Sequence, residues 1–167
     1  MGFAPNTNVI GVGGRTLAIV EAGPKPVELD DELATVGTCD MSGTLEHGYS
    51  AHPKLDPVTG LLHSANYFWA RPGCIDYTVV DRSLRVVRHE EVPVPGSPMV
   101  HDMSITERFA VFYDQPVVFD LDGAMAGASF PYVWDEGYGC RVGVLALDGD
   151  GVDDLQWFEI EPCYVFH

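Results

Sequence analysis

The chain has 167 residues, which is enough for one domain with a sizeable buried core. It carries 9 lysines and arginines against 25 aspartates and glutamates, a formal net charge of −16. Binding to nucleic-acid phosphates needs a basic surface, so this charge argues against a nucleic-acid partner. The sequence also has no polybasic segment for anionic lipid headgroups, although a peripheral membrane contact stays open.

The sequence predicts a cytoplasmic protein without a transmembrane segment. No apolar run approaches the roughly 18 residues that a transmembrane helix needs. The first residues lack the basic and apolar regions of a signal peptide, and they also miss the myristoylation pattern. The four cysteines are scattered without a Cys-x-x-Cys pair, which favours reduced thiols over a disulfide framework.

Short segments rich in β-branched and aromatic residues recur along the chain, separated by Gly, Pro, Asp and Ser. We expect strands in residues 15–21, the end of 29–36, 62–70, 75–81, 84–92, 109–114, 116–119, 141–147, 155–160 and 164–167. Nowhere do apolar residues keep helical spacing over a long window, so the predicted fold class is all-β. Strands of this kind indicate a sandwich, a barrel or a propeller, and periodicity does not choose among them.

Two loop motifs are better explained as turns than as binding sites. The glycine cluster of residues 11–14 lacks the lysine and the spacing of a phosphate-binding loop, so we expect a β-turn there. Residues 148–154 resemble half of a calcium loop, but the downstream glutamate and the flanking helices of an EF-hand are missing. A turn between two strands fits them better. The segment that begins at residue 120 is expected to be irregular.

Six histidines are candidate ligands, and three of them stand out by their context. The others have ordinary explanations, in a solvated charge cluster, at a strand start and in a turn: His89, His63 and His47. Three lie beside proline, aspartate or apolar residues, where a buried imidazole needs a partner: His52, His101 and His167. Their wide separation excludes a local zinc-finger clip but suits ligands that successive sheets deliver to one metal. A single histidine in such a context is usually an ordinary core or surface residue.

The last residues, 163–167, form an apolar aromatic run that stops at His167, as if a strand were still in progress. Natural domains more often end in a polar tail. We therefore expect a fragment of a longer protein, with residues 1–167 forming a single partial domain.

Three motifs surround the three histidines, in residues 51–60 (AHPKLDPVTG), 99–107 (MVHDMSITE) and 159–167 (EIEPCYVFH). Their sequences and their order resemble the carotenoid cleavage oxygenases, a family that includes carotenoid, apocarotenoid and lignostilbene dioxygenases and the retinoid isomerase of the eye. Further matches lie in residues 6–9, 17–21, 116–120 and 141–145. The resemblance covers nearly the whole chain.

This resemblance implies about three blades of a seven-bladed β-propeller, whose axis holds iron(II) bound by four histidines. His52, His101 and His167 match the first three ligands; the fourth is expected beyond this sequence, and a stretch before Met1 is expected to be missing. Glu21 matches a glutamate that accepts the second N–H of a ligand, here His101. A charge facing water at a strand end is the alternative explanation of Glu21. Asp102 is expected to cap the backbone behind His101.

The implied reaction inserts both atoms of dioxygen across a carbon–carbon double bond of an apolar polyene or stilbene-like substrate, giving two carbonyl products. The isolated fragment is expected to bind iron weakly and to be inactive, because an incomplete propeller holds three ligands poorly. Two alternatives stay open. One is a non-catalytic propeller module with a vestigial metal site, and the other is a zinc or iron hydrolase that uses the same histidines and water.

Overall fold

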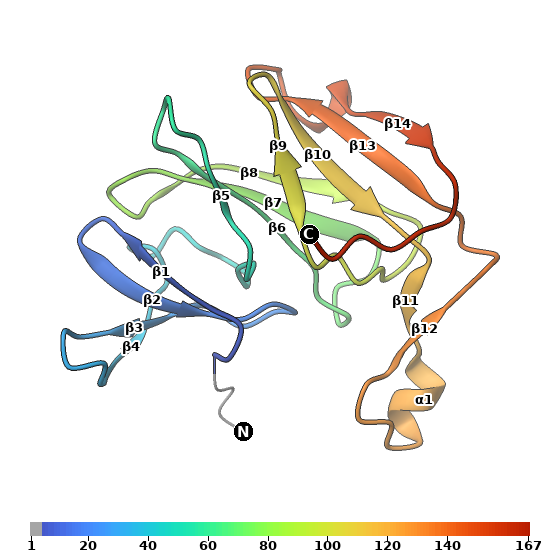
Figure 1. The fold of residues 1–167 in the computed structure, drawn as a ribbon, viewed down its shortest axis with the longest axis horizontal. Helices are drawn as coiled ribbons and strands as arrows, with labels where there is room; N and C mark the ends of the chain where they lie inside the picture. The colour runs from blue at the N-terminus through green and yellow to red at the C-terminus, as the bar shows by residue number, and fades with distance from the viewer. Residues whose placement is uncertain (1–4) are drawn as a thin grey trace.

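The computed structural model describes residues 5–167 and consists almost entirely of antiparallel β-strands (Figure 1). The predicted all-β fold class is therefore confirmed. No helix among the described residues is long and apolar enough to cross a membrane. The expectation about a signal peptide also concerned residues 1–4, which lie outside the described residues.

Three four-stranded antiparallel sheets follow one another along the chain. The first sheet contains β1 (Asn8–Val12), β2 (Arg15–Ile19), β3 (Val27–Leu29) and β4 (Thr35–Thr38). The second sheet contains β5 (Lys54–Leu55), β6 (Leu62–Asn66), β7 (Cys74–Val80) and β8 (Val86–Pro93). The third sheet contains β9 (Met103–Ile105), β10 (Phe109–Asp114), β13 (Arg141–Ala146) and β14 (Gln156–Glu159).

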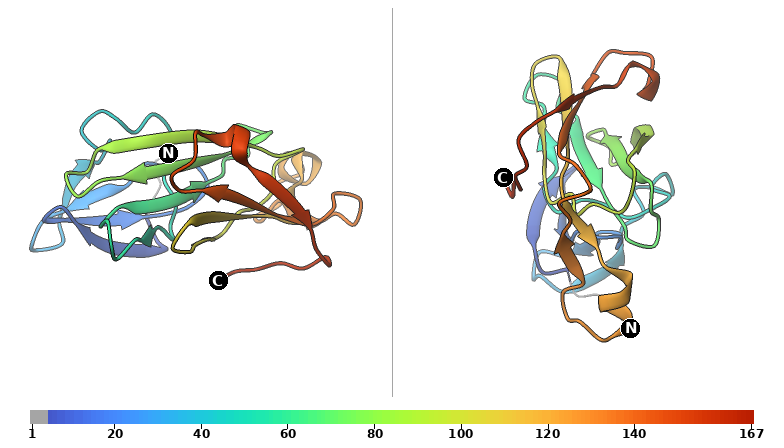
Figure 2. Two further views of the ribbon diagram at one scale, coloured as in Figure 1. Left: turned by 90° about the horizontal axis from the view of Figure 1, so that it is seen from above. Right: turned by 90° about the vertical axis from the view of Figure 1, so that its right-hand side faces the viewer.

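A small hairpin interrupts the third sheet between β10 and β13. It pairs β11 (Val117–Phe119) with β12 (Tyr132–Trp134), and the short helix α1 (Leu121–Met125) connects them. The arrangement of sheets is flattened, and this hairpin projects from one end of it (Figure 2). At the other end of the sequence, the segment after β14 turns back and brings the chain end beside the start of β9 (Figure 1).

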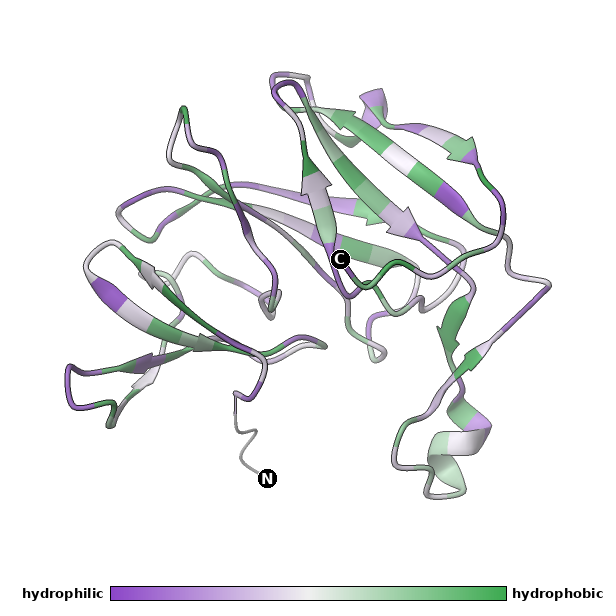
Figure 3. Ribbon diagram, viewed as in Figure 1, coloured by the Kyte–Doolittle hydropathy of each residue, from purple (hydrophilic) through white to green (hydrophobic). Residues whose placement is uncertain are grey.

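The second sheet is the centre of the hydrophobic core because neighbours cover both of its faces. One cluster packs it against the first sheet, with Leu17, Ile19, Tyr49, Leu62 and Val80 among its members. The other packs it against the third sheet, with Tyr77, Val92, Met103, Phe112 and Leu145 among its members. Strand β7 is accordingly buried from Ile75 to Val80. Figure 3 shows the apolar residues concentrated along β10 and β13, which supply the third sheet's side of the core.

Both predicted turns are present. The first hairpin turns at Gly13 and Gly14, whose φ angles of +60° and +74° suit a two-residue turn that ordinary side chains disfavour. The turn is shorter than expected, since Gly11 and Val12 pair within β1. Residues 148–154 connect β13 to β14 through a turn and a short 3-10 helix, Val152–Asp154.

The strand expected at residues 164–167 was wrong, because these residues have irregular backbone. The Val165 N–H donates to the side chain of Gln115 instead of to a neighbouring strand. Five strands were not expected: β1, β3, β5, β9 and β12. Strands β5 and β9 have two and three residues, too few for an alternating pattern to be recognised. Helix α1 forms where an irregular segment was expected, and it buries none of its residues.

Gly48 lies where the segment after β2 packs against the segment that leads to His52. A β-carbon on Gly48 would overlap the backbone of Gly23. Next to it, the Tyr49 N–H donates to the Pro24 carbonyl oxygen at 3.0 Å. This backbone contact therefore sets how closely the first and second sheets approach each other near the centre.

We expect Gly48→Ala to lower the free energy of unfolding by about 2 kcal/mol, because the added methyl group forces two backbone segments apart. Urea denaturation measures the change. Gly37→Ala, in β4, is the matched control because no atom lies within 4 Å of its added β-carbon. The control should stay within about 0.5 kcal/mol of the wild type. Equal stability of the two variants would contradict the packing role of Gly48.

Candidate metal centre

Three histidines from distant parts of the sequence converge at the centre of the fold. Their potential ligand atoms all lie within 4.8 Å of one another: His52, His101 and His167. His52 lies two residues before β5, and His101 lies two residues before β9. Each of these strands begins its own sheet, so the same position in two successive sheets presents a histidine to the centre. His167 arrives there through the irregular segment after β14.

The imidazole rings are close enough to share one ion. The ring centroid of His52 lies 4.5 Å from that of His101 and 4.6 Å from that of His167, and the third pair is 5.1 Å apart. The buried Nε2 of His52 has no hydrogen-bond partner among the described residues. A buried nitrogen without a partner is costly unless a ligand satisfies it. A metal ion bound by Nε2 would remove that cost, so the residues present fit a metal.

The electrostatics favour the neutral form of His52, which is the form that binds metals. Burial lowers the pKa of His52, and the neighbouring His101 lowers it further. No carboxylate accepts a hydrogen bond from the ring of His52 in the described structure. His52 is thus a desolvated ligand candidate whose ring has no carboxylate acceptor.

Glu21 lies two residues after β2 and contacts the ring of His101. Its two carboxylate oxygens lie 3.0 Å and 2.9 Å from His101 Nδ1. With the carboxylate as acceptor, the proton of the neutral ring resides on Nδ1, and Nε2 keeps its lone pair for a metal. The alternative of a solvent-facing charge does not describe this geometry, since both side chains are largely buried.

Asp102 makes more contacts than the sequence suggested. Its Oδ1 accepts the Met103 N–H at 2.7 Å, which is the expected role in the backbone behind His101. Its Oδ2 also accepts from Lys54 Nζ at 2.7 Å and lies 3.2 Å from His167 Nδ1. One buried carboxylate therefore joins the segments of all three histidines. Nothing in the sequence indicated this role, apart from the position of Lys54 and Asp102 beside ligand candidates.

Three tyrosines surround Glu21, and sequence reasoning missed them. They are contributed by the loop after β6, by β12 and by the final segment: Tyr67, Tyr132 and Tyr164. Burial and then the charge of Glu21 raise their phenol pKa values, to about 12 for Tyr132. The phenols stay neutral at physiological pH, so the Glu21 carboxylate is held in a largely aromatic environment. Such surroundings strengthen its attraction for the His101 proton.

A second cluster of potential ligands has a different explanation. His47, Asp76 and Glu91 also lie within 4.8 Å of one another. Arg71, however, donates to Asp76 at 2.5 Å and to Glu91 at 2.6 Å, so a guanidinium group already neutralises both acids. His89 Nε2 donates to Asp76 Oδ1 at 3.0 Å. The prediction that His89 belongs to a solvated charge cluster is therefore only partly right, since this network is half-buried.

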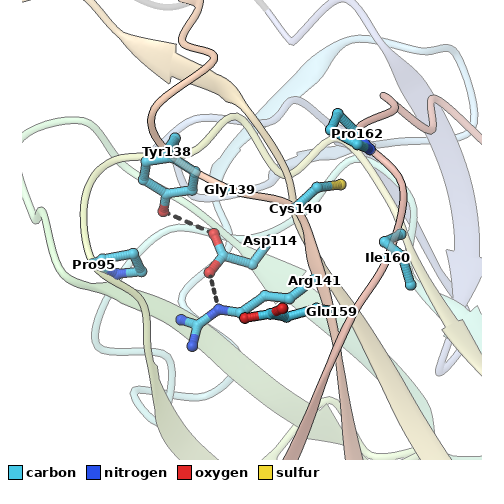
Figure 4. Close-up of a pocket in the computed structure, with 9 residues that line it drawn as sticks. All are labelled: Pro95, Asp114, Tyr138, Gly139, Cys140, Arg141, Glu159, Ile160 and Pro162. Atoms are coloured by element: carbon cyan, nitrogen blue, oxygen red, sulfur yellow. Dashed lines mark hydrogen bonds and ion pairs between the residues drawn. The ribbon is translucent and has the colours of Figure 1, made fainter.

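A surface cavity of about 400 Å³ lies at one edge of the third sheet, away from the three histidines (Figure 4). Its polar groups satisfy one another. Asp114 is 1% exposed and accepts hydrogen bonds from Tyr138 Oη and Arg141 Nε, each at 2.7 Å. This arrangement ties the loop before β13 to the end of β10, which is a structural role.

Comparison with known proteins shows the family to which the chain belongs. Residues 3–167 match the family model described as "Retinal pigment epithelial membrane protein". The carotenoid cleavage oxygenase of Mycobacterium tuberculosis is 41% identical over 98% of this chain and 40% of its own length.

Two solved structures share the fold. The lignostilbene dioxygenase of Pseudomonas brassicacearum is 29% identical, with a TM-score of 0.82 over 93% of this chain and 32% of that one. A cobalt-substituted apocarotenoid oxygenase of Synechocystis is 25% identical, with a TM-score of 0.81 over 98% of this chain and 36% of that one. The chain thus spans between about a third and two fifths of the length of these relatives. It belongs to the carotenoid cleavage oxygenase family, and its three four-stranded sheets are part of that family's seven-bladed propeller.

Proposed function

We propose that this chain forms part of an iron(II)-dependent dioxygenase that cleaves a carbon–carbon double bond into two carbonyl products. The observation that carries the proposal is the convergence of His52, His101 and His167, with the buried Nε2 of His52 left without a hydrogen-bond partner. The matched relatives are named for carotenoids, apocarotenoids and lignostilbene, so we propose an apolar polyene or a stilbene-like compound as substrate, with dioxygen as co-substrate. We also propose a cytoplasmic location, in line with four free cysteines.

The three imidazoles would hold the ion, and bound iron(II) would supply the redox chemistry of the reaction with dioxygen. The surrounding residues have separate tasks. Glu21 keeps the proton of His101 on Nδ1, and Asp102 orients His167 from the other side. Phe166 packs edge-on against His101, with ring centroids 5.4 Å apart. The three neutral imidazoles carry no charge. The positive charge of the bound ion would therefore be balanced only by the nearby carboxylates of Glu21 and Asp102.

The activity belongs to the whole protein. Because the chain spans at most about two fifths of its relatives, we propose that further blades complete the site and the substrate cavity. We expect the isolated chain to bind iron weakly and to lack turnover. A full-length protein with tightly folded sheets but no bound metal would instead indicate a non-catalytic propeller module.

The first test substitutes His101 by Ala in the full-length protein that carries this chain. We expect at least a 100-fold loss of alkene cleavage, because the metal loses a ligand. Mass spectrometry after reaction under ¹⁸O₂ should show label in both carbonyl products of the unsubstituted protein. His47→Ala, in the cluster neutralised by Arg71, is the control and should keep full activity. Products without label would indicate a hydrolase, and full activity of His101→Ala would refute the assignment of the site.

The second test measures metal affinity after Glu21→Ala in the same protein. We expect the dissociation constant for Co²⁺ to rise by about 10- to 100-fold, because His101 loses the carboxylate that fixes its tautomer and orientation. The dissociation constant of Glu21→Gln should lie between those of the wild type and Glu21→Ala, because its amide oxygen still accepts a hydrogen bond from His101 Nδ1–H. Glu28→Ala removes an acid from the same sheet and should leave the affinity unchanged. If Glu21→Ala binds Co²⁺ as tightly as the wild type does, Glu21 has no role in the site.

A further inference from the structure

The segment that carries His167, residues 161–167, is held by side chains and not by strand pairing. The last sheet-like contact before it is the hydrogen bond from the Ile160 N–H to the Cys140 carbonyl oxygen, at 3.0 Å. Within the described part of the chain, residues 161–167 take part in no backbone–backbone hydrogen bond. Side chains must therefore determine where this irregular segment lies and where its terminal imidazole points.

Gln115 is the buried side chain that bonds the segment at two places. It lies between β10 and β11 and is 1% exposed. Its Oε1 accepts the Val165 N–H at 2.9 Å, and its Nε2 donates to Cys163 Sγ at 3.4 Å. A reversed amide would face the Val165 N–H with its own NH₂ group, so the two contacts together select one orientation of the side chain.

The remaining contacts of the segment guide it without bonding its backbone N–H groups. Tyr164 Oη donates to the Met99 carbonyl oxygen at 3.3 Å, and Phe166 packs on the ring of His101. The ring of His167 itself contacts Asp102, with Nδ1 3.2 Å from Oδ2. The Cys140 thiol donates to the Cys163 carbonyl oxygen at 3.7 Å, which is a weak hydrogen bond. The hydrogen bond from the Val165 N–H to Gln115 is the backbone hydrogen bond nearest to His167, two residues before it.

We infer that Gln115 is a positioning residue for the metal ligand His167, an inference that rests on the metal centre proposed above. Two residues of free chain span up to about 7 Å, whereas a metal–nitrogen bond tolerates only about 0.2 Å. Anchoring the backbone at Val165 removes most of that freedom. Gln115 thereby links the third sheet to the ligand that arrives last in the chain.

The neighbouring residue illustrates that this role is specific to Gln115. Asp114 directs its carboxylate to Tyr138 and Arg141 at the edge cavity of Figure 4, and none of these contacts reaches residues 163–167. Adjacent side chains at the end of β10 therefore serve two purposes: one holds the sheet together and the other holds the segment of His167.

Gln115→Met tests the inference in the full-length protein, because methionine keeps the volume of the side chain and removes both hydrogen bonds. We expect faster hydrogen exchange of the Val165 amide and about a tenfold higher dissociation constant for Co²⁺, with an altered visible spectrum of the bound ion. Leu84→Ala is the matched control. It loosens the other core cluster, between the first and second sheets, in which no residue of 161–167 takes part, so it should change neither readout at comparable stability.

A conservative variant separates positioning from general packing. Gln115→Glu keeps an acceptor for the Val165 N–H, so we expect it to restore part of the Val165 protection and part of the Co²⁺ affinity. Wild-type exchange and affinity in Gln115→Met would overturn the role of Gln115 while leaving the metal centre intact. Absence of Co²⁺ binding by the unsubstituted protein would overturn the metal centre and this inference together.

Discussion

The hydrogen bond between Glu21 and His101 is the interaction on which the rest of the site depends. It joins side chains 80 residues apart, one in the connection between β2 and β3 of the first sheet and one just before β9 of the third. Between these two sheets lies the second sheet, which packs against both of them. The Glu21 carboxylate also needs the N–H donor of His101, because a buried acid without a partner is strongly destabilising. The hydrogen bond between Glu21 and His101 therefore links the packing of the sheets to the tautomer of His101.

The propeller arrangement explains why ligands so far apart in sequence meet at one point. In both the second and the third sheet, the chain enters through a histidine and then forms the short first strand, β5 or β9. Repetition of one sheet plan around a centre thus repeats the position of the ligand. Asp102 and Lys54 reinforce this symmetry, since their ion pair of 2.7 Å connects the entry segments of the two sheets.

The sequence predicted the strands that are long enough to show an alternating pattern of apolar and polar residues. Strand β10 matches its expected range, and its alternating burial is the pattern that allows such a prediction. Strands β5 and β9 are too short to show any pattern, although they flank the ligand candidates. The apolar run at residues 164–167 suggested a strand, but burial there comes from packing of Tyr164 against the core and not from strand pairing.

The candidate ligands could be selected from the sequence because the motif around each histidine consists of residues that are neighbours in the chain. The supporting contacts could not, because they depend on which distant side chains become neighbours. Nothing near Gln115 in the sequence indicates that its amide lies beside Cys163 and Val165, 48 and 50 residues away. The same is true of the three tyrosines around Glu21. Long-range contacts of this kind are fixed by the packing of whole sheets, for which a single sequence holds no local signal.

A site assembled from three sheets couples metal binding to their packing. His52, His101 and His167 belong to three separate segments, and no two of them are close in the unfolded chain. An ion that binds all three stabilises the packed state by the full free energy of binding, because the unfolded chain offers no comparable site. The desolvated Nε2 of His52 works in the opposite direction when no ion is bound, since its burial then costs free energy. The centre of the fold is therefore the place where stability is given up for function, and the surrounding core of the second sheet must compensate for it.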